Sequence, residues 1–79
     1  SEKMVTDLFL KLLPGAEAYI GNYITLKKRF SFRELLEKQK SKMEVIVTFL
    51  VILELMKVGR VTIEQDNLFD DIIVISNEI

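Results

Sequence analysis

The stretch that decides the fold is EVIVTFLVILELMKV, residues Glu44–Val58, because it is apolar on two separate faces of a helix. At about 100° per residue, one wide arc holds Ile52, Val45, Met56, Phe49, Leu53, Ile46 and Leu50. A second arc holds Val47, Val58, Val51 and Leu55, and only Thr48, Glu54 and Lys57 interrupt the ring. A surface helix needs one apolar stripe, and a small domain has one core. The second face is therefore expected to meet another part of this fold or a partner, which favours a binding module.

Length and composition limit what the chain can be. It has 79 residues, which predicts a single domain covering residues 1–79. The net charge of -1 gives no overall attraction to nucleic acid or anionic membrane. The chain contains no cysteine and no histidine, which removes thiol nucleophiles, imidazole bases, disulfides and the common zinc sites. The abrupt start suggests a C-terminal fragment of a longer protein.

The region before the long helix is expected to be helical in two pieces. Apolar residues at helical spacing predict a helix over Glu2–Leu13, and Pro14-Gly15 is predicted to end it. A second helix is predicted over Ala16–Arg29, with an extended connection as the alternative because Gly21-Asn22 weakens the helical pattern.

Capping residues mark the next elements. Phe30–Phe32 predicts a short β-like element, and Ser31 begins a capping box that starts a helix over Arg33–Lys40. Ser41 is the predicted N-cap of the long helix, and Gly59 is placed to end it.

After Gly59 the period changes from helical to alternating, which predicts a strand over Val61–Gln65. Asp66-Asn67 is typical of a turn, and Ile72–Ile75 predicts a second strand, so the pair forms a β-hairpin. Helix-turn-helix followed by a hairpin is the winged-helix pattern. The expected fold is therefore α+β and mostly helical, with the hairpin as the wing.

Residues that carry chemistry are sparse. The carboxylates of Glu64, Asp66, Asp70 and Asp71 fall in the wing, where they suit a cation or acid–base site less well than a solvated hairpin tip, since no calcium-type loop is present. No serine has a histidine to activate it, and the glycines form no phosphate-binding loop. We expect no enzyme activity, no metal and no cofactor.

A basic run offers a different function. Its members are Lys27, Lys28, Arg29, Arg33, Lys38, Lys40 and Lys42. They could contact phosphate, as in a DNA-binding winged-helix transcription regulator, or form the solvated surface of two helices. The long helix would be the reading helix, but its outward residues would be valines, leucines, Thr48 and Glu54, with Lys57 at the wrong end. The sequence thus favours the fold without sequence-specific base reading.

Several short segments resemble the C-terminal winged-helix domain of kleisins, in particular the bacterial segregation and condensation protein A family. They are Phe30–Leu36, Val47–Leu50, Leu53–Lys57, Val61, Glu64-Gln65 and Phe69–Ile72. The resemblance covers residues 24–75, whereas residues 1–23 match poorly. The family often has glycine at the position of Asp70, and its first helix corresponds either to Met4–Leu13, which we favour, or to Tyr19–Lys28.

The resemblance implies docking on the cap face of an SMC ATPase head, which helps to close the SMC–kleisin ring in chromosome condensation and segregation. The head-contacting residues of the family correspond to Phe49 and Leu53, flanked by Ile46 and Leu50, while Phe69 and Ile72 on the wing are either contacts or core. It also implies an SMC–ScpB complex formed through the rest of the parent chain, and a cytoplasmic, nucleoid-associated location.

Two further expectations concern partners. The second apolar arc could instead be a homodimer seam, and the isolated domain could self-associate. No membrane span is expected, because the apolar run Val45–Leu53 is far shorter than the roughly 20 residues that a bilayer requires.

Overall fold

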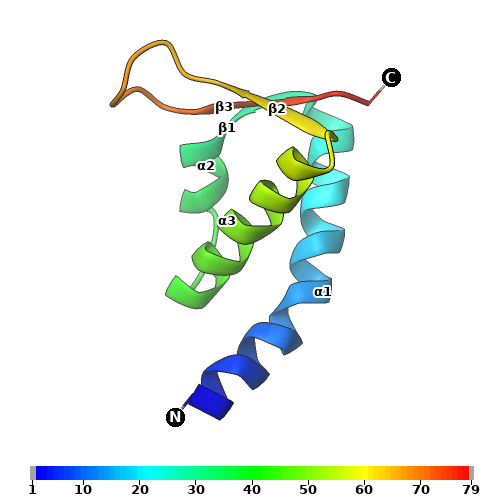
Figure 1. Ribbon diagram of the computed structural model, residues 1–79, viewed down its shortest axis with the longest axis vertical. Helices are drawn as coiled ribbons and strands as arrows, with labels where there is room; N and C mark the ends of the chain where they lie inside the picture. Colours follow the sequence, from blue (N-terminus) through cyan, green and yellow to red (C-terminus); the bar gives the residue numbers. More distant parts are fainter. Residues whose placement is uncertain (1, 79) are drawn as a thin grey trace.

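The computed structural model describes residues 2–78, which form three helices below a small sheet (Figure 1). The elements are α1 (Glu2–Lys27), β1 (Arg29–Ser31), α2 (Phe32–Glu37), α3 (Lys42–Lys57), β2 (Val61–Glu64) and β3 (Ile73–Ser76). The loop between β2 and β3 projects beyond α2 and forms the wing. The predicted mostly helical α+β winged-helix architecture is confirmed.

Helix α1 is one continuous helix of 26 residues, so the prediction that Pro14-Gly15 ends it is wrong. Proline lacks an N–H and its ring crowds the preceding turn, and the axis of α1 changes direction between its dark-blue and cyan turns in Figure 1. The helix persists because Leu12 and Leu13 before the proline and Ala16 and Ile20 after it all pack on the same core. Tertiary packing of an apolar face supplies most helical stability in proteins and outweighs local propensity here.

This continuity removes two alternatives. The extended connection considered for Ala16–Arg29 does not occur, because the segment is helical up to Lys27. The choice between Met4–Leu13 and Tyr19–Lys28 as the first helix also disappears, since α1 contains the first segment and all of the second except Lys28. In Figure 1 the N-terminal turns of α1 extend below the first turn of α3.

Both predicted N-caps are present. The hydroxyl of Ser31 accepts a hydrogen bond from the Glu34 amide at 3.1 Å, and that of Ser41 accepts one from the Glu44 amide at 3.1 Å. Helix α2 ends at Glu37 rather than at Lys40. The early end follows from Gln39, whose side chain donates to the Leu35 carbonyl at 2.9 Å and so replaces a helical partner.

Helix α3 ends as Gly59 predicts. The Gly59 amide donates to the Met56 carbonyl at 3.1 Å, and the Arg60 amide donates to the Leu55 carbonyl at 2.9 Å. These two bonds form a Schellman motif, which needs a left-handed residue between helix and strand. Gly59 supplies it with φ of 80°.

Exchanging glycines for alanine should therefore give effects of opposite sign. Gly59→Ala is expected to destabilise the domain by about 1 kcal/mol, since alanine is strained at positive φ. Gly21→Ala is expected to stabilise it by about 0.5–1 kcal/mol, because alanine is the better helix former. A methyl group at either position meets no atom within 4 Å, so backbone conformation alone separates the two. Urea unfolding of both variants measures this, and equal signs would contradict it.

The sheet contains the predicted hairpin and one further pairing. β2 and β3 are antiparallel, and β1 pairs antiparallel with the other edge of β3, which gives the order β1-β3-β2. Phe30 in β1 lies opposite Val74 in β3, and both side chains are buried. The short element at Phe30 is thus the strand that attaches the helices to the wing.

The core lies where the three helices meet the sheet. Its buried apolar members are Ile20, Ile24, Phe30, Phe32, Leu35, Val47, Val51, Ile52, Leu55, Val61 and Val74. Five of these come from α1 and α2 or the strand between them, and four from α3, so α3 is the central element of the domain. Within residues 2–78, no helix combines the length and apolar character that crossing a bilayer requires.

Candidate protein-docking surface

The two apolar arcs of α3 have different surroundings. The buried residues of the helix are Val47, Thr48, Val51, Ile52 and Leu55. They include most of the second arc, which packs in the core with α1 and β2. A homodimer seam on this arc is therefore wrong, because only Val58 at its end is largely exposed.

The opposite face of α3 is apolar and open. Ile46, Phe49, Leu50 and Leu53 are 43%, 44%, 41% and 43% exposed, respectively. Their spacing of three, four and seven residues places them in one row on the helix. Each of the four side chains keeps about two-fifths of its surface open to water, and contiguous exposed apolar surface of this kind marks an interaction site. The structure thus brings together the four α3 residues that the sequence singled out.

The row continues onto α2 and the wing. The Phe49 ring lies 5.8 Å from the Phe32 ring, between centroids. Phe32 and Leu36 in turn line a groove of about 390 Å³ between α2 and the wing, together with Asp70 and Ile72. Sequence reasoning missed Phe32 and Leu36 as parts of this surface. The available signal was their spacing of four residues, which places both side chains on one face of a helix.

The two wing residues occupy different environments. Ile72 is partly buried against the core, and its carbonyl accepts a hydrogen bond from the Phe32 amide at 2.9 Å. Phe69 is 91% exposed at the tip of the wing. These wing residues were expected to be either partner contacts or core. The partial burial of Ile72 fits a place in the core, and the exposure of Phe69 fits a surface contact.

Asp71 fastens the wing to α2. Its carboxylate accepts a short hydrogen bond from the Ser31 hydroxyl and another from the Arg33 amide at 3.2 Å. The Ser31 bond lowers the pKa of Asp71 below its ordinary value of 3.8, and the Arg33 amide adds to this effect. The expectation of a solvated hairpin tip therefore fits the exposed side chains of Glu64, Asp66 and Asp70 but does not fit Asp71. Within residues 2–78, no three acidic or other metal-ligating side chains converge as a metal site would require.

Asp71→Asn should test this link through pH. A lowered folded-state pKa means that the charge stabilises the fold above pH 3.8 and that this contribution is lost as pH falls through the lowered value. At neutral pH the substitution is expected to cost about 1 kcal/mol, less than a fully buried charged bond, because the side chain is partly exposed. Urea unfolding should show the difference shrinking in strong acid. A pH-independent difference would mean that the charge has no part in it.

The basic run is divided among several contacts. The Lys38 ammonium donates to the Tyr23 hydroxyl at 3.1 Å and lies 5.0 Å from the centre of its ring, while Lys27 lies 6.0 Å from that centre. The Tyr23 hydroxyl raises the pKa of Lys38 above its ordinary 10.5. Arg29 forms an ion pair with Glu64 at 3.1 Å. Of the seven cations in the run, Arg29 is thus ion-paired with a carboxylate, and Lys27 and Lys38 lie at the Tyr23 ring.

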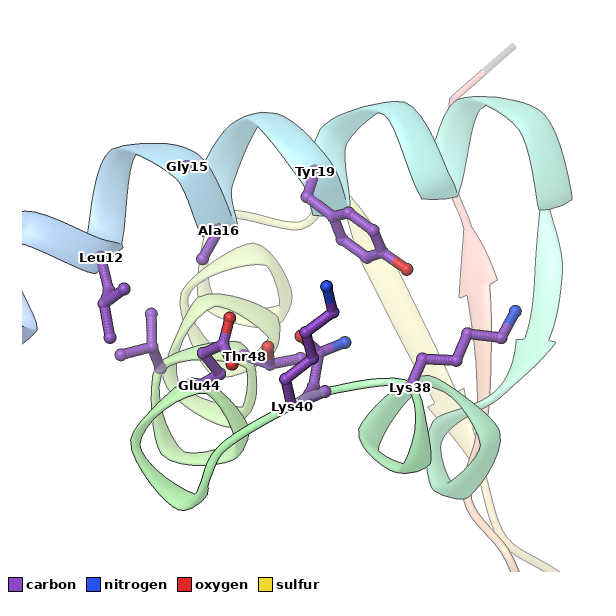
Figure 2. Close-up of a pocket in the computed structure, with 10 residues that line it drawn as sticks. Leu12, Gly15, Ala16, Tyr19, Lys38, Lys40, Glu44 and Thr48 are labelled. Atoms are coloured by element: carbon purple, nitrogen blue, oxygen red, sulfur yellow. The ribbon is translucent and has the colours of Figure 1, made fainter.

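A hollow of about 320 Å³ lies beside these lysines, between α1 and the start of α3. Figure 2 shows Lys38 and Lys40 reaching toward α1 around it, with Tyr19 on one wall and Thr48 on the floor. Thr48 is only 2% exposed, so the expectation that it faces outward is wrong. It faces α1 because it lies on the same side of α3 as Val47 and Val51.

The outward face of α3 therefore offers almost nothing to a base edge. Reading bases needs Arg, Lys, Asn, Gln or similar donors and acceptors, and the row from Ile46 to Leu53 has none. Apolar side chains of this kind suit a protein surface. The geometry supports docking between proteins.

Comparison with known proteins agrees with this architecture. A solved structure described as the SMC head bound to the C-winged helix domain of ScpA contains a chain with the same fold, with a TM-score of 0.57 and 23% identity. The likeness covers 86% of this chain and 97% of that one. The winged-helix assignment thus stands on an independent structure.

The relatives found by sequence share one protein name. Segregation and condensation protein A of Caldanaerobacter subterraneus is 40% identical over 66% of this chain, and that of Halothermothrix orenii is 50% identical over 53%. The protein of Streptococcus agalactiae is 36% identical over 75% of it. The chain spans only 17% to 25% of the length of these relatives. The family model for segregation and condensation protein ScpA matches residues 4–76, helix α1 included, and the chain therefore belongs to the ScpA family.

Proposed function

We propose that this domain docks on an SMC ATPase head through the exposed row of α3, with Phe49 and Leu53 as central anchors and Ile46 and Leu50 beside them. The observation that carries the proposal is the row itself, four apolar side chains each about two-fifths exposed on the central helix. Membership of the ScpA family supports it. So does the likeness to a domain that was crystallised bound to an SMC head.

The wing contributes to the same contact. Ile72 lines the groove that begins at Phe32, and Phe69 projects beyond it. The docked surface of the head is its cap face, and docking helps to close an SMC–kleisin ring in chromosome condensation and segregation. The rest of the parent chain joins the SMC–ScpB complex, in the cytoplasm at the nucleoid. The domain itself is no enzyme and takes no cofactor, because ATP hydrolysis belongs to the head.

Calorimetric titration of the domain into a purified SMC head tests the proposal. We expect saturable one-to-one binding with a negative heat-capacity change, the mark of apolar burial. A gel shift with duplex DNA at low salt is the companion experiment. A folded, monomeric domain that binds DNA with steep salt dependence and binds no head would overturn docking and favour a DNA-binding regulator.

A further inference from the structure

The tip of the wing exposes two adjacent apolar side chains. Leu68 is 77% exposed and Phe69 is 91% exposed, the latter being the most exposed large apolar side chain in the described part of the chain. Both side chains are in contact with water, and neither belongs to the core. An aromatic and an aliphatic side chain of this size are what protein interfaces use as anchors in a partner's pocket.

The loop that carries them is held in one shape by its own polar groups. The Gln65 side chain donates to the Leu68 carbonyl at 3.0 Å and to the Asp70 carbonyl at 2.8 Å. The Asn67 side chain donates to the Asp70 carboxylate at 3.0 Å, and the Asp70 amide donates to the Asn67 carbonyl at 3.0 Å. Asp70 keeps a negative φ, so it needs no glycine conformation. Such preorganisation lowers the entropy lost when the loop binds.

The charge around the tip limits what it can bind. Residues 61–78 contain no lysine and no arginine, whereas residues 64–71 contain four carboxylates. Of these, Glu64 is paired with Arg29, and Asp71 is bonded to Ser31. Asp66 and Asp70 remain beside the apolar pair. Negative charge here repels DNA phosphates and anionic lipid headgroups, and it suits a protein pocket rimmed by Lys or Arg.

We propose that the wing tip is a second anchor, in which Leu68 and Phe69 enter an apolar socket rimmed by Lys or Arg on the same SMC head. This inference rests on the proposed function. The tip belongs to the same surface as α3, because the Phe49 ring contacts Phe32 and the groove beside Phe32 reaches Asp70 at the base of the tip. Gln65 is a positioning residue that acts through the shape of the loop.

The test is titration of the SMC head with a double variant, Leu68→Ser with Phe69→Ser. We expect binding at least about tenfold weaker than wild type, as for loss of an interface anchor. The matched control is Leu26→Ser, because Leu26 is 82% exposed on α1, away from the docking surface. It should bind as wild type does. Neither change touches the core, so both proteins should unfold at the same urea concentration as wild type.

The variant Gln65→Leu separates the effect of the loop's shape from the effect of the contacts that Leu68 and Phe69 make. It leaves Leu68 and Phe69 in place but removes both side-chain bonds to the loop, so we expect weaker binding together with faster amide hydrogen exchange over residues 66–70. Unchanged affinity despite a loosened loop would overturn the positioning role.

The outcomes distinguish this inference from the proposed function. If the double variant binds the head as tightly as Leu26→Ser does while Phe49→Arg binds weakly, the second anchor is wrong and docking through α3 stands. If wild type binds no head, both fail. Loss of self-association in sedimentation, or of binding to phosphatidylglycerol vesicles, with head affinity unchanged would assign the tip to a second copy or a membrane and also overturn the inference.

Discussion

Replacing Phe49 or Leu53 with arginine is expected to weaken binding to an SMC head by about 30-fold to 1,000-fold, which corresponds to ~2–4 kcal/mol for a central anchor. The physical reason is twofold. The variant loses the apolar area that the wild-type side chain buries, and it forces a guanidinium into a contact that offers no prepared partner. A buried charge without a partner costs several kcal/mol.

The free domain should tolerate either change. Phe49 and Leu53 are 44% and 43% exposed, so an arginine at either position can extend its charged end into water while its methylenes stay on the helix. We expect the free energy of unfolding to change by less than about 1 kcal/mol. Circular dichroism melts should therefore resemble those of wild type, while calorimetric titration shows the loss of affinity.

Leu26→Arg is the matched control for charge. Leu26 is on α1 and 82% exposed, so this variant adds the same positive charge away from the row. It should bind the head with wild-type affinity. If folded Phe49→Arg and Leu53→Arg proteins bind as tightly as Leu26→Arg does, α3 is not the contact and the site must be sought elsewhere on the domain.

Local signals predicted the helices and the wing because the chemistry that ends an element is itself local. The hydroxyls of Ser31 and Ser41 accept the amide bonds that their positions predict. Gly59 adopts the positive φ that ending α3 requires. The change from helical to alternating period after Gly59 gave the hairpin for the same reason, since side-chain period depends only on neighbouring residues.

Contacts between residues far apart in the sequence decided the features that local sequence patterns could not predict. Pro14 is a strong local signal to end a helix, and the core contacts of α1 on both sides of it override that signal. The pairing of β1 with β3 joins residues far apart in sequence, which no local period can reveal. The angular positions of the α3 side chains around the helix axis showed two apolar arcs. They did not show which arc the other helices would cover.

The candidate site was predictable in part. The apolar arc of α3 and the family resemblance pointed to the row of Ile46, Phe49, Leu50 and Leu53. The structure gives these side chains similar exposure on one face of the helix. Phe32 and Leu36 were missed as parts of the surface because the groove beside them exists only after the wing folds over α2. Leu68 was missed because an apolar residue in a turn carries no periodic signal.

The second large effect concerns stability and separates the two faces of α3 directly. Ile52 is 3% exposed and Ile46 is 43% exposed, yet both are isoleucines within the same helix. Ile52→Ala is expected to lower the free energy of unfolding by about 2–5 kcal/mol, since it leaves a cavity in the core. Ile46→Ala is expected to cost less than about 1 kcal/mol, because water fills the vacated space.

The pair is matched, since the gain in helix propensity from isoleucine to alanine is the same at both positions. Any difference in urea unfolding therefore measures burial alone. Ile52→Val, with an expected loss of about 0.5–1.5 kcal/mol, keeps the comparison measurable if the alanine variant is too unstable to fold. Equal losses at Ile46 and Ile52 would mean that the row is part of the core. In that case α3 would have no free face, and an SMC head could not dock there without unpacking the domain.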